Sequence, residues 1–160
     1  MSKELVELWM RITTKNLYRS WTGGVIAGLF FHKGLLDNTP LYDFIKEHFK
    51  DKDIHRLVHF NSVEANSGTI VSFDETNDKE SFTRGLVATA SVPFIFPPLQ
   101  IGDGIMIDGG VAWNLDLSSA INKCRTLVDS DEKIVLDIID VDLSVDHLPL
   151  FNHTDKRNSV

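Results

Sequence analysis

The chain has 160 residues, the length of one domain, and its 42% hydrophobic and 24% charged residues are typical of a globular protein. A formal net charge of −7 argues against a surface that follows nucleic-acid phosphates, so no nucleic-acid partner is predicted. One cysteine excludes an intrachain disulfide, and no stretch approaches the ~20 apolar residues of a membrane span. These features predict a cytoplasmic protein that either stays in solution or binds membranes peripherally.

Helices are predicted for most of the first third of the chain. Residues 2–19 repeat apolar side chains at spacings of three and four, with charged residues between them, which indicates an amphipathic helix. The Thr-Gly-Gly at 22–24 interrupts this pattern, and Gly34 is expected to stop the next helix. Residues 37–40 (Asp-Asn-Thr-Pro) form a turn that can cap a further helix over 41–49.

Strands are predicted next. Residues 55–62 and 69–73 have the composition of two strands, and the Asn-Ser-Gly at 66–68 favours a hairpin between them. Residues 81–90 are expected to form a short helix capped by Ser81.

A proline-rich stretch then leads to a second hairpin. Pro93, Pro97 and Pro98 favour extended backbone, because proline restricts the residue before it to extended conformations. The Gly-Asp-Gly at 102–104 separates two short apolar runs, which is the pattern of a tight turn between strands.

The last third is predicted to hold one helix and one strand. Residues 115–127 form the helix, with Cys124 on its apolar face and therefore in the core. Residues 133–143 form the strand, and the polar residues from Asn152 onward are expected to fray. Helices mixed with strands in this order indicate an α/β domain.

Metal sites fit the sequence poorly. His55 and His59 lie four residues apart, but no Glu follows the first as a zinc-protease helix requires. Asp140 and Asp142 suggest a calcium loop, yet Val145 stands where that loop needs glycine. No metal and no cofactor are therefore predicted.

The most informative stretch runs from residue 88 to 114. Its apolar run at 105–107 leads directly into Asp108, and Gly109 and Gly110 follow. A strand that delivers a carboxylate to its own end, beside backbone without side chains, suits a catalytic group. On this local pattern alone, a role as a turn former is the favoured interpretation of an Asp before Gly.

Several stretches together resemble the middle and later parts of a patatin-like phospholipase domain, from about residue 17 to 140. They are TTKNLYRSWTGG, GLLDNTPLYDFI, VHFNSVEANSGTIVSFDE, ATASVPFIFPP and IDGGVAWNLDLSSAI. The resemblance implies a three-layer α/β/α sandwich and a lipid acyl hydrolase with a Ser–Asp dyad. It implies that Asp108, in the motif Asp108-Gly109-Gly110, is the proton acceptor that activates the serine. Phospholipids or other acyl-ester lipids at a membrane surface are the implied partners.

Two family elements are absent from the sequence, the Gly-rich oxyanion loop and the Gly-x-Ser-x-Gly nucleophile elbow. Residues 1–150 are therefore expected to form an incomplete domain that also lacks the first strand, followed by a polar tail at 151–160. Such a domain is expected to be inactive alone, as a fragment or as a remnant completed by another chain.

Two other functions remain in view. One is a non-catalytic lipid-binding or interaction module on the same scaffold, in which Phe30, Phe31, Phe94 and Phe96 contact acyl chains. The other is an unrelated esterase that uses Ser91, although Val92-Pro93 follows where an elbow needs a small residue.

Overall fold

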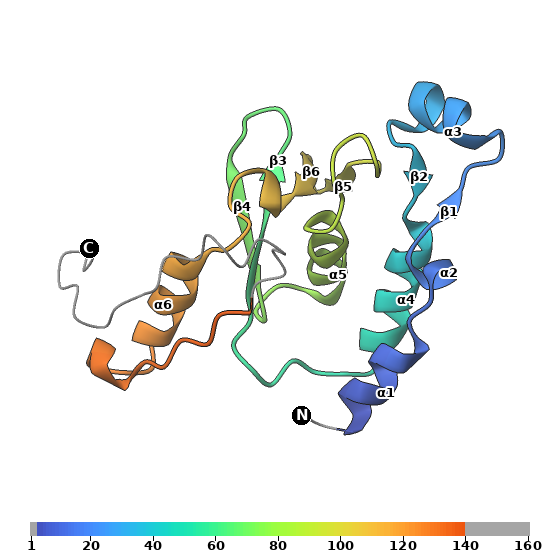
Figure 1. Cartoon of the computed structure of the whole chain (residues 1–160). Helices are drawn as coiled ribbons and strands as arrows, with labels where there is room; N and C mark the ends of the chain where they lie inside the picture. Colours follow the sequence, from blue (N-terminus) through green and yellow to red (C-terminus); the bar gives the residue numbers. More distant parts are fainter. Residues whose placement is uncertain (1–2, 140–160) are drawn as a thin grey trace, which may run out of the picture.

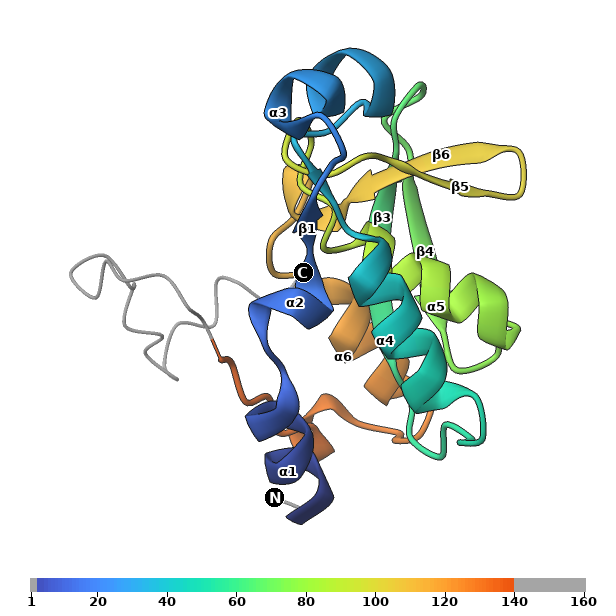
Figure 2. The same ribbon diagram turned by 90° about the vertical axis from the view of Figure 1, so that its right-hand side faces the viewer.

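A computed structural model describes residues 3–139 of the chain (Figures 1 and 2). Its α-helices are α1 (Lys3–Arg11), α2 (Thr14–Leu17), α3 (Gly24–Ala27), α4 (Thr39–Phe49), α5 (Lys79–Ala88) and α6 (Leu117–Arg125). Its other helical turns are η1 (Gly28–His32), η2 (Gly109–Val111) and η3 (Asp131–Lys133). Its strands are β1 (Arg19–Ser20), β2 (Leu36–Asp37), β3 (His59–Glu64), β4 (Ile70–Asp74), β5 (Leu99–Ile101) and β6 (Gly104–Asp108). Within this range no helix has the length and apolar content needed to cross a bilayer.

The main sheet has four strands in the order β4-β3-β6-β5, and every neighbouring pair is antiparallel. Both predicted hairpins are confirmed, β3–β4 and β5–β6. Gly68 and Gly102 have φ of +72° and +57° in the two turns, a conformation that glycine adopts without steric cost. The central pair β3–β6 places Ser62 opposite Asp108.

Helices cover both faces of this sheet. Successive residues of β3 point to opposite faces. The Phe60 ring packs on Phe82 of α5, with ring centroids 5.1 Å apart, whereas Asn61 hydrogen-bonds to Asp116 at the start of α6. Helix α4 packs on the outside of α5, where the Phe49 ring meets Phe82. The layers are therefore α5 with α4, the sheet, and α6, which confirms the predicted α/β class.

The core lies between α5 and the sheet. Its buried apolar side chains are Phe73, Phe82, Val87, Ala88 and Met106, whereas the buried Val63 alternates with Ser62 and lies on the Asn61 face of β3. Gly85 allows the close approach of α5, because a Cβ atom there would lie 2.8 Å from the Phe73 ring. Burial of these apolar side chains between α5 and the sheet stabilises the four-stranded sheet.

The N-terminal third forms an arm beside this core (Figure 2). The helix predicted over 2–19 divides into α1 and α2, because the Thr13 hydroxyl and N–H both donate to Asn16 and start a new helix there. Residues 1–2 lie outside the described part. The turn at 37–40 is confirmed, since the Asp37 carboxylate accepts the Thr39 N–H at 2.9 Å and α4 begins at Thr39.

Three predicted boundaries are wrong by a few residues. Strand β3 begins at His59 instead of residue 55, because the Val58 N–H donates to the Glu75 side chain and takes no part in the ladder. Helix α5 begins two residues early, because the Asp78 carboxylate caps it and Ser81 is already inside it. The second helix ends at His32 with Lys33 in the left-handed region, one residue before the predicted stop at Gly34.

The prolines do not keep the backbone extended throughout. Residues 93–95 form a turn, and Phe94 has φ of +68°, which is unusual for a residue with a side chain. The turn is held because the carbonyls of Phe94 and Ile95 accept the N–H groups of Leu35 and Leu36, each at 2.9 Å.

The helix predicted over 115–127 is confirmed as α6, but the burial of Cys124 and the strand predicted after it are wrong where the structure describes them. Cys124 is exposed, because its neighbour Lys123 points to the sheet and successive helical residues lie about 100° apart. The predicted strand at 133–143 is not formed over 134–139, where no described strand pairs with it. Residues 140–143 and the predicted tail lie outside the described residues.

Candidate functional site

Asp108 stands at the end of β6, where the sequence places it. Its N–H donates to the Ser91 carbonyl at 3.1 Å, and its strand is held against β3 through the Ser62–Asp108 pair. The residue is half-buried. Strand pairing on one side and the Ser91 carbonyl on the other therefore fix the backbone that carries this carboxylate.

The two glycines after Asp108 let the chain turn sharply. Asp108 Oδ1 accepts the Gly110 N–H at 2.8 Å and so caps the single turn η2. Gly109 is buried, and a Cβ atom there would collide with the Asn61 backbone. Gly109 thus allows a close approach to β3, and both glycines have negative φ. The turn-forming role of Asp108 is real, and it occupies one carboxylate oxygen.

The other carboxylate oxygen, Oδ2, accepts no hydrogen bond within residues 3–139. Asp108 borders a hollow of about 300 Å³ formed by β3, the end of α5, η2 and the start of α6. Its lining is His59, Phe60, Asn61, Thr89, Asp108, Gly109, Gly110, Trp113, Asn114, Leu115, Asp116 and Ala120. Two larger hollows lie along α4 and between the end of α4 and the start of α5, and neither contains a predicted site residue. The hollow therefore brings both polar and apolar side chains next to the Asp108 carboxylate.

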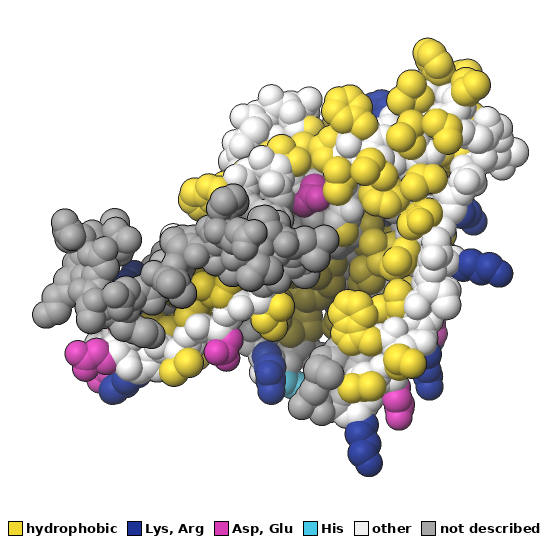
Figure 3. All heavy atoms as spheres, in the orientation of Figure 1, with side chains coloured by type: hydrophobic (Ala, Val, Ile, Leu, Met, Phe, Trp, Pro, Cys, Tyr) yellow, Lys and Arg dark blue, Asp and Glu magenta, His cyan; other side chains and the backbone are white. Residues whose placement is uncertain are grey.

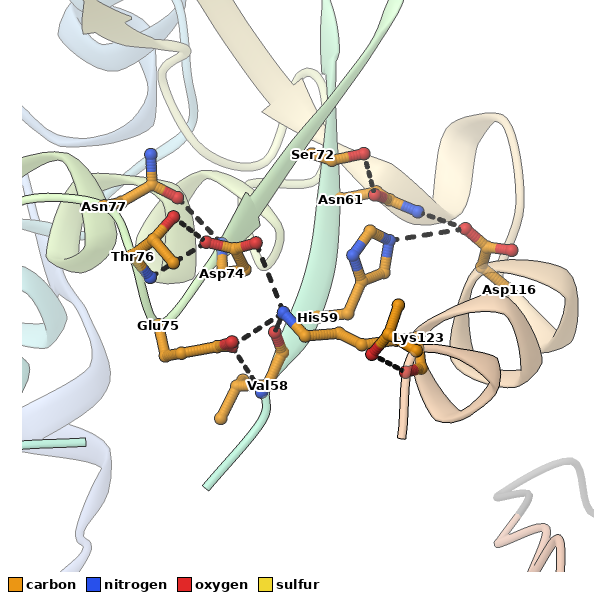
Figure 4. A network of polar contacts seen from close by, with 11 residues as sticks. Val58, His59, Asn61, Ser72, Asp74, Glu75, Thr76, Asn77, Asp116 and Lys123 are labelled. Carbon is orange, nitrogen blue, oxygen red and sulfur yellow. Dashed lines mark hydrogen bonds and ion pairs between the residues drawn. The ribbon is translucent and has the colours of Figure 1, made fainter. Parts of the chain in front are cut away.

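A polar network lies along the same hollow (Figure 4). Asn61 Nδ2 donates to Asp116 Oδ2 at 2.6 Å, and His59 Nε2 lies 3.8 Å from the same oxygen. Burial opposes ionisation of Asp116, but hydrogen bonds from Ser119 and Asn61 outweigh it and lower its pKa. His59 Nε2 is buried and has no hydrogen-bond partner in the described chain. This leaves a histidine nitrogen beside a carboxylate at the edge of the hollow.

Lys123 holds α6 in place below this network (Figure 4). Its Nζ donates to the Val58 carbonyl at 2.8 Å, to Glu75 at 2.7 Å and to Asp74 at 3.2 Å. Burial lowers the pKa of Lys123, but the Glu75 and Asp74 carboxylates more than compensate and raise it. Lys123 therefore remains charged and ties the helix that contributes Asp116 to the end of β3.

Ser91 cannot act as an exposed nucleophile. Its side chain has 0% exposure, its Oγ donates to the Val87 carbonyl at 2.7 Å, and it accepts from Asn38 Nδ2 at 2.8 Å. The esterase hypothesis based on Ser91 is therefore wrong. Ser91 instead connects the start of α4 to the segment whose carbonyl receives the Asp108 N–H.

The sequence did not identify His59, Asn61 and Asp116 as neighbours of Asp108. The useful clue was the alternation His59-x-Asn61, which puts two polar side chains on one face of a strand. Asp116 also precedes a helix, where its Oδ1 accepts the Ser119 N–H as a helix cap. Within the described residues no three His, Cys, Asp or Glu side chains gather as metal ligands.

Comparison with protein-family models identifies the family of the chain. The family model described as patatin-like phospholipase matches residues 1–121, from before α1 into α6. The chain belongs to the patatin-like phospholipase family. The matched range includes Asp108-Gly109-Gly110 and every strand of the sheet.

Membership gives the fold and the general chemistry. The patatin-like phospholipase fold is an α/β/α sandwich, in agreement with the layers around this sheet, and the chain contains it incompletely. The family acts on lipid substrates and belongs to the lipid acyl hydrolases. No curated protein matches the chain.

Proposed function

We propose that Asp108 is the proton acceptor of a Ser–Asp dyad in a lipid acyl hydrolase, acting on phospholipids or other acyl-ester lipids. The main support is its position: a half-buried carboxylate at a strand end, beside a hollow, with Oδ2 unoccupied by the described chain. Family membership supports the reaction class. Because Oδ1 is held by Gly110, the free oxygen has a fixed direction in which to accept a proton.

In this reaction the serine hydroxyl transfers its proton to Asp108 as its Oγ attacks the ester carbonyl carbon. The C–O bond to the alcohol then breaks, the proton passes to the leaving alcohol, and an acyl-serine remains. Water attacks the acyl-serine while Asp108 takes its proton, the acyl–Oγ bond breaks to release the fatty acid, and the proton passes from Asp108 to the serine Oγ. Asp108 therefore serves both half-reactions and returns to its ionised form.

The nucleophile and the oxyanion donors must come from polypeptide other than these 160 residues. The sequence contains neither a Gly-x-Ser-x-Gly elbow nor a Gly-rich oxyanion loop. A general base alone contributes about 10²–10⁴-fold of an enzyme's acceleration, and oxyanion donors contribute a comparable share. We therefore expect negligible ester turnover from the chain alone.

The test is a chimera in which a patatin-like segment with the Gly-rich loop and the elbow precedes Met1. We expect it to hydrolyse a nitrophenyl ester and to lose about 10²–10⁴-fold in kcat on Asp108→Asn. Asp103→Asn is the matched control, because Asp103 lies in the turn of the same hairpin and is exposed. Hydrolysis by a folded chimera that survives Asp108→Asn would contradict the proposed role.

A second candidate is a non-catalytic lipid-binding module. The observation that favours it is the exposure of Phe30, Phe31 and Phe94, at 76%, 80% and 80%. Phe96, in contrast, is half-buried and its ring lies 6.1 Å from that of Tyr18. Under this alternative the chimera would bind lipid vesicles without hydrolysing esters, with or without Asp108.

A further inference from the structure

One end of the molecule carries a group of exposed apolar side chains. Figures 1 and 2 both show α3 at this end, beyond the short strands β1 and β2. Figure 3 shows hydrophobic side chains gathered over α3 and over the neighbouring loop that leads to β5. We call this group the apolar tip, and its members are Val25, Ile26, Leu29, Phe30, Phe31 and Phe94.

The tip is apolar on more than one side. Val25 and Ile26 are adjacent in a helix, as are Phe30 and Phe31, and adjacent helical residues point about 100° apart. The side chains of all four are more than half exposed. A protein partner that docks on one side would cover only one row of these side chains. Lipid can contact the helix on every side that carries exposed apolar side chains. The arrangement therefore fits insertion into an apolar medium better than docking on one face.

Phe94 joins the tip through a constrained backbone. Its φ of +68° is costly for a residue with a side chain, and its carbonyl accepts the Leu35 N–H just beyond η1. Phe94 has this strained backbone although its side chain is 80% exposed and does not belong to the core. Phe94 therefore presents an exposed aromatic side chain from a turn that is hydrogen-bonded to the residues just beyond η1.

The charges around the tip are opposite in sign to the protein as a whole. The chain has a net charge of −7, yet residues 19–36, which include the tip residues of α3 and η1, contain no Asp or Glu and include Arg19 and Lys33. Residues 88–102, which contain Phe94, carry no charged side chain at all. Arg19 pairs with Asp37 at 2.7 Å but remains 65% exposed. An apolar end bordered by basic residues in an acidic protein is complementary to an anionic lipid surface.

We propose that the apolar tip inserts into the surface of an anionic lipid bilayer, with Lys33 and Arg19 at the level of the headgroups. The choice of lipid as the occupant rests on the proposed function, since the substrate of a lipid acyl hydrolase resides in such a surface. The site of insertion rests on the exposure, direction and charge of the tip residues. Insertion would place the acyl-ester groups of the bilayer next to the protein without a membrane-spanning helix.

The test uses the full chain and vesicles of phosphatidylcholine with or without phosphatidylglycerol. We expect co-sedimentation with the anionic vesicles and a loss of about tenfold or more in the partition coefficient for the variant Phe30→Ser/Phe31→Ser. Lys33→Glu should weaken binding to the anionic vesicles by more than about fivefold and change little on neutral ones. Both variants should keep the parental thermal midpoint, because these side chains are exposed.

Leu127→Ser is the matched control, since Leu127 is 72% exposed but lies beyond α6. Equal loss in this control, binding unaffected by the Phe30→Ser/Phe31→Ser variant, or no binding by the parent would each overturn the proposal. So would a parental dimer that this double variant converts to a monomer, because the tip would then cover a second copy. Asp108→Asn should bind vesicles as the parent does, so failure of the catalytic proposal is distinguishable from failure of insertion.

Discussion

Replacement of Ser91 by alanine should destabilise the protein, because it removes the hydrogen-bond acceptor of the Asn38 side chain and leaves that amide buried. Asn38 is only 6% exposed, and its Nδ2 donates to the Ser91 hydroxyl at 2.8 Å. The Val87 carbonyl loses the hydrogen bond from the Ser91 hydroxyl but stays paired, because it also accepts the Ala90 N–H at 3.1 Å. The cost is therefore that of one buried unpaired amide donor, about 1–3 kcal/mol. We expect about 2 kcal/mol, which corresponds to a fall of roughly 4–8 °C in Tm for a chain of this size.

Urea unfolding followed by tryptophan fluorescence measures this cost. Ser118→Ala, at an exposed position of α6, is the control and should stay within about 0.5 kcal/mol of the parent. A double-mutant cycle with Asn38→Ala should show a coupling energy of about 0.5 kcal/mol or more, because the two side chains share one hydrogen bond. A Ser91→Ala variant as stable as the parent, or strict additivity with Asn38→Ala, would refute the reasoning.

Three further predictions concern the core, acid stability and the turn after Asp108. Phe82→Ala should cost about 3–5 kcal/mol in urea unfolding, because Phe82 is 4% exposed and joins α4, α5 and β3. Hydrogen bonds in the hairpin turn lower the pKa of Glu64 from 4.5 to about 2, so its contribution to stability is present above pH 4.5 and is lost as the pH falls toward 2. Thermal unfolding of Glu64→Gln across that range should show a weaker pH dependence than the parent, and an unchanged dependence would contradict this. Gly109→Ala should cost about 1–3 kcal/mol through its collision with the Asn61 backbone, whereas Gly110→Ala, which meets only side-chain atoms, should cost less; equal costs would contradict this.

The hairpins could be predicted because their determinants are local. Gly68 and Gly102 adopt positive φ in turns of a few residues, and the flanking apolar runs define the strands directly. The Asp37–Thr39 turn is of the same kind, since the capping carboxylate lies two residues from the N–H that it accepts. Asp108 could be placed at a strand end for the same reason. Interactions within a few residues leave a pattern in the sequence.

Features that depend on distant residues could not be predicted. Cys124 has the spacing of a core residue, but the contacts of Lys123 with Val58 and Glu75 set the rotation of α6 and turn Cys124 outward. Asn61 and Asp116 lie 55 positions apart, and neither carries a local sign of the other. The composition of residues 134–139 favours a strand, but a strand also requires a paired neighbour.

The Asp108 site and the apolar tip are joined by one short segment, residues 91–94. The Ser91 carbonyl accepts the Asp108 N–H, and the Phe94 carbonyl accepts the Leu35 N–H next to η1. Four residues reach at most about 14 Å even when fully extended, and this segment includes a turn. Because Ser91 is also fixed to Asn38, its segment has little freedom to move independently of either end. A shift of the tip against a bilayer must therefore be absorbed by these residues or be transmitted to the strand end that carries Asp108.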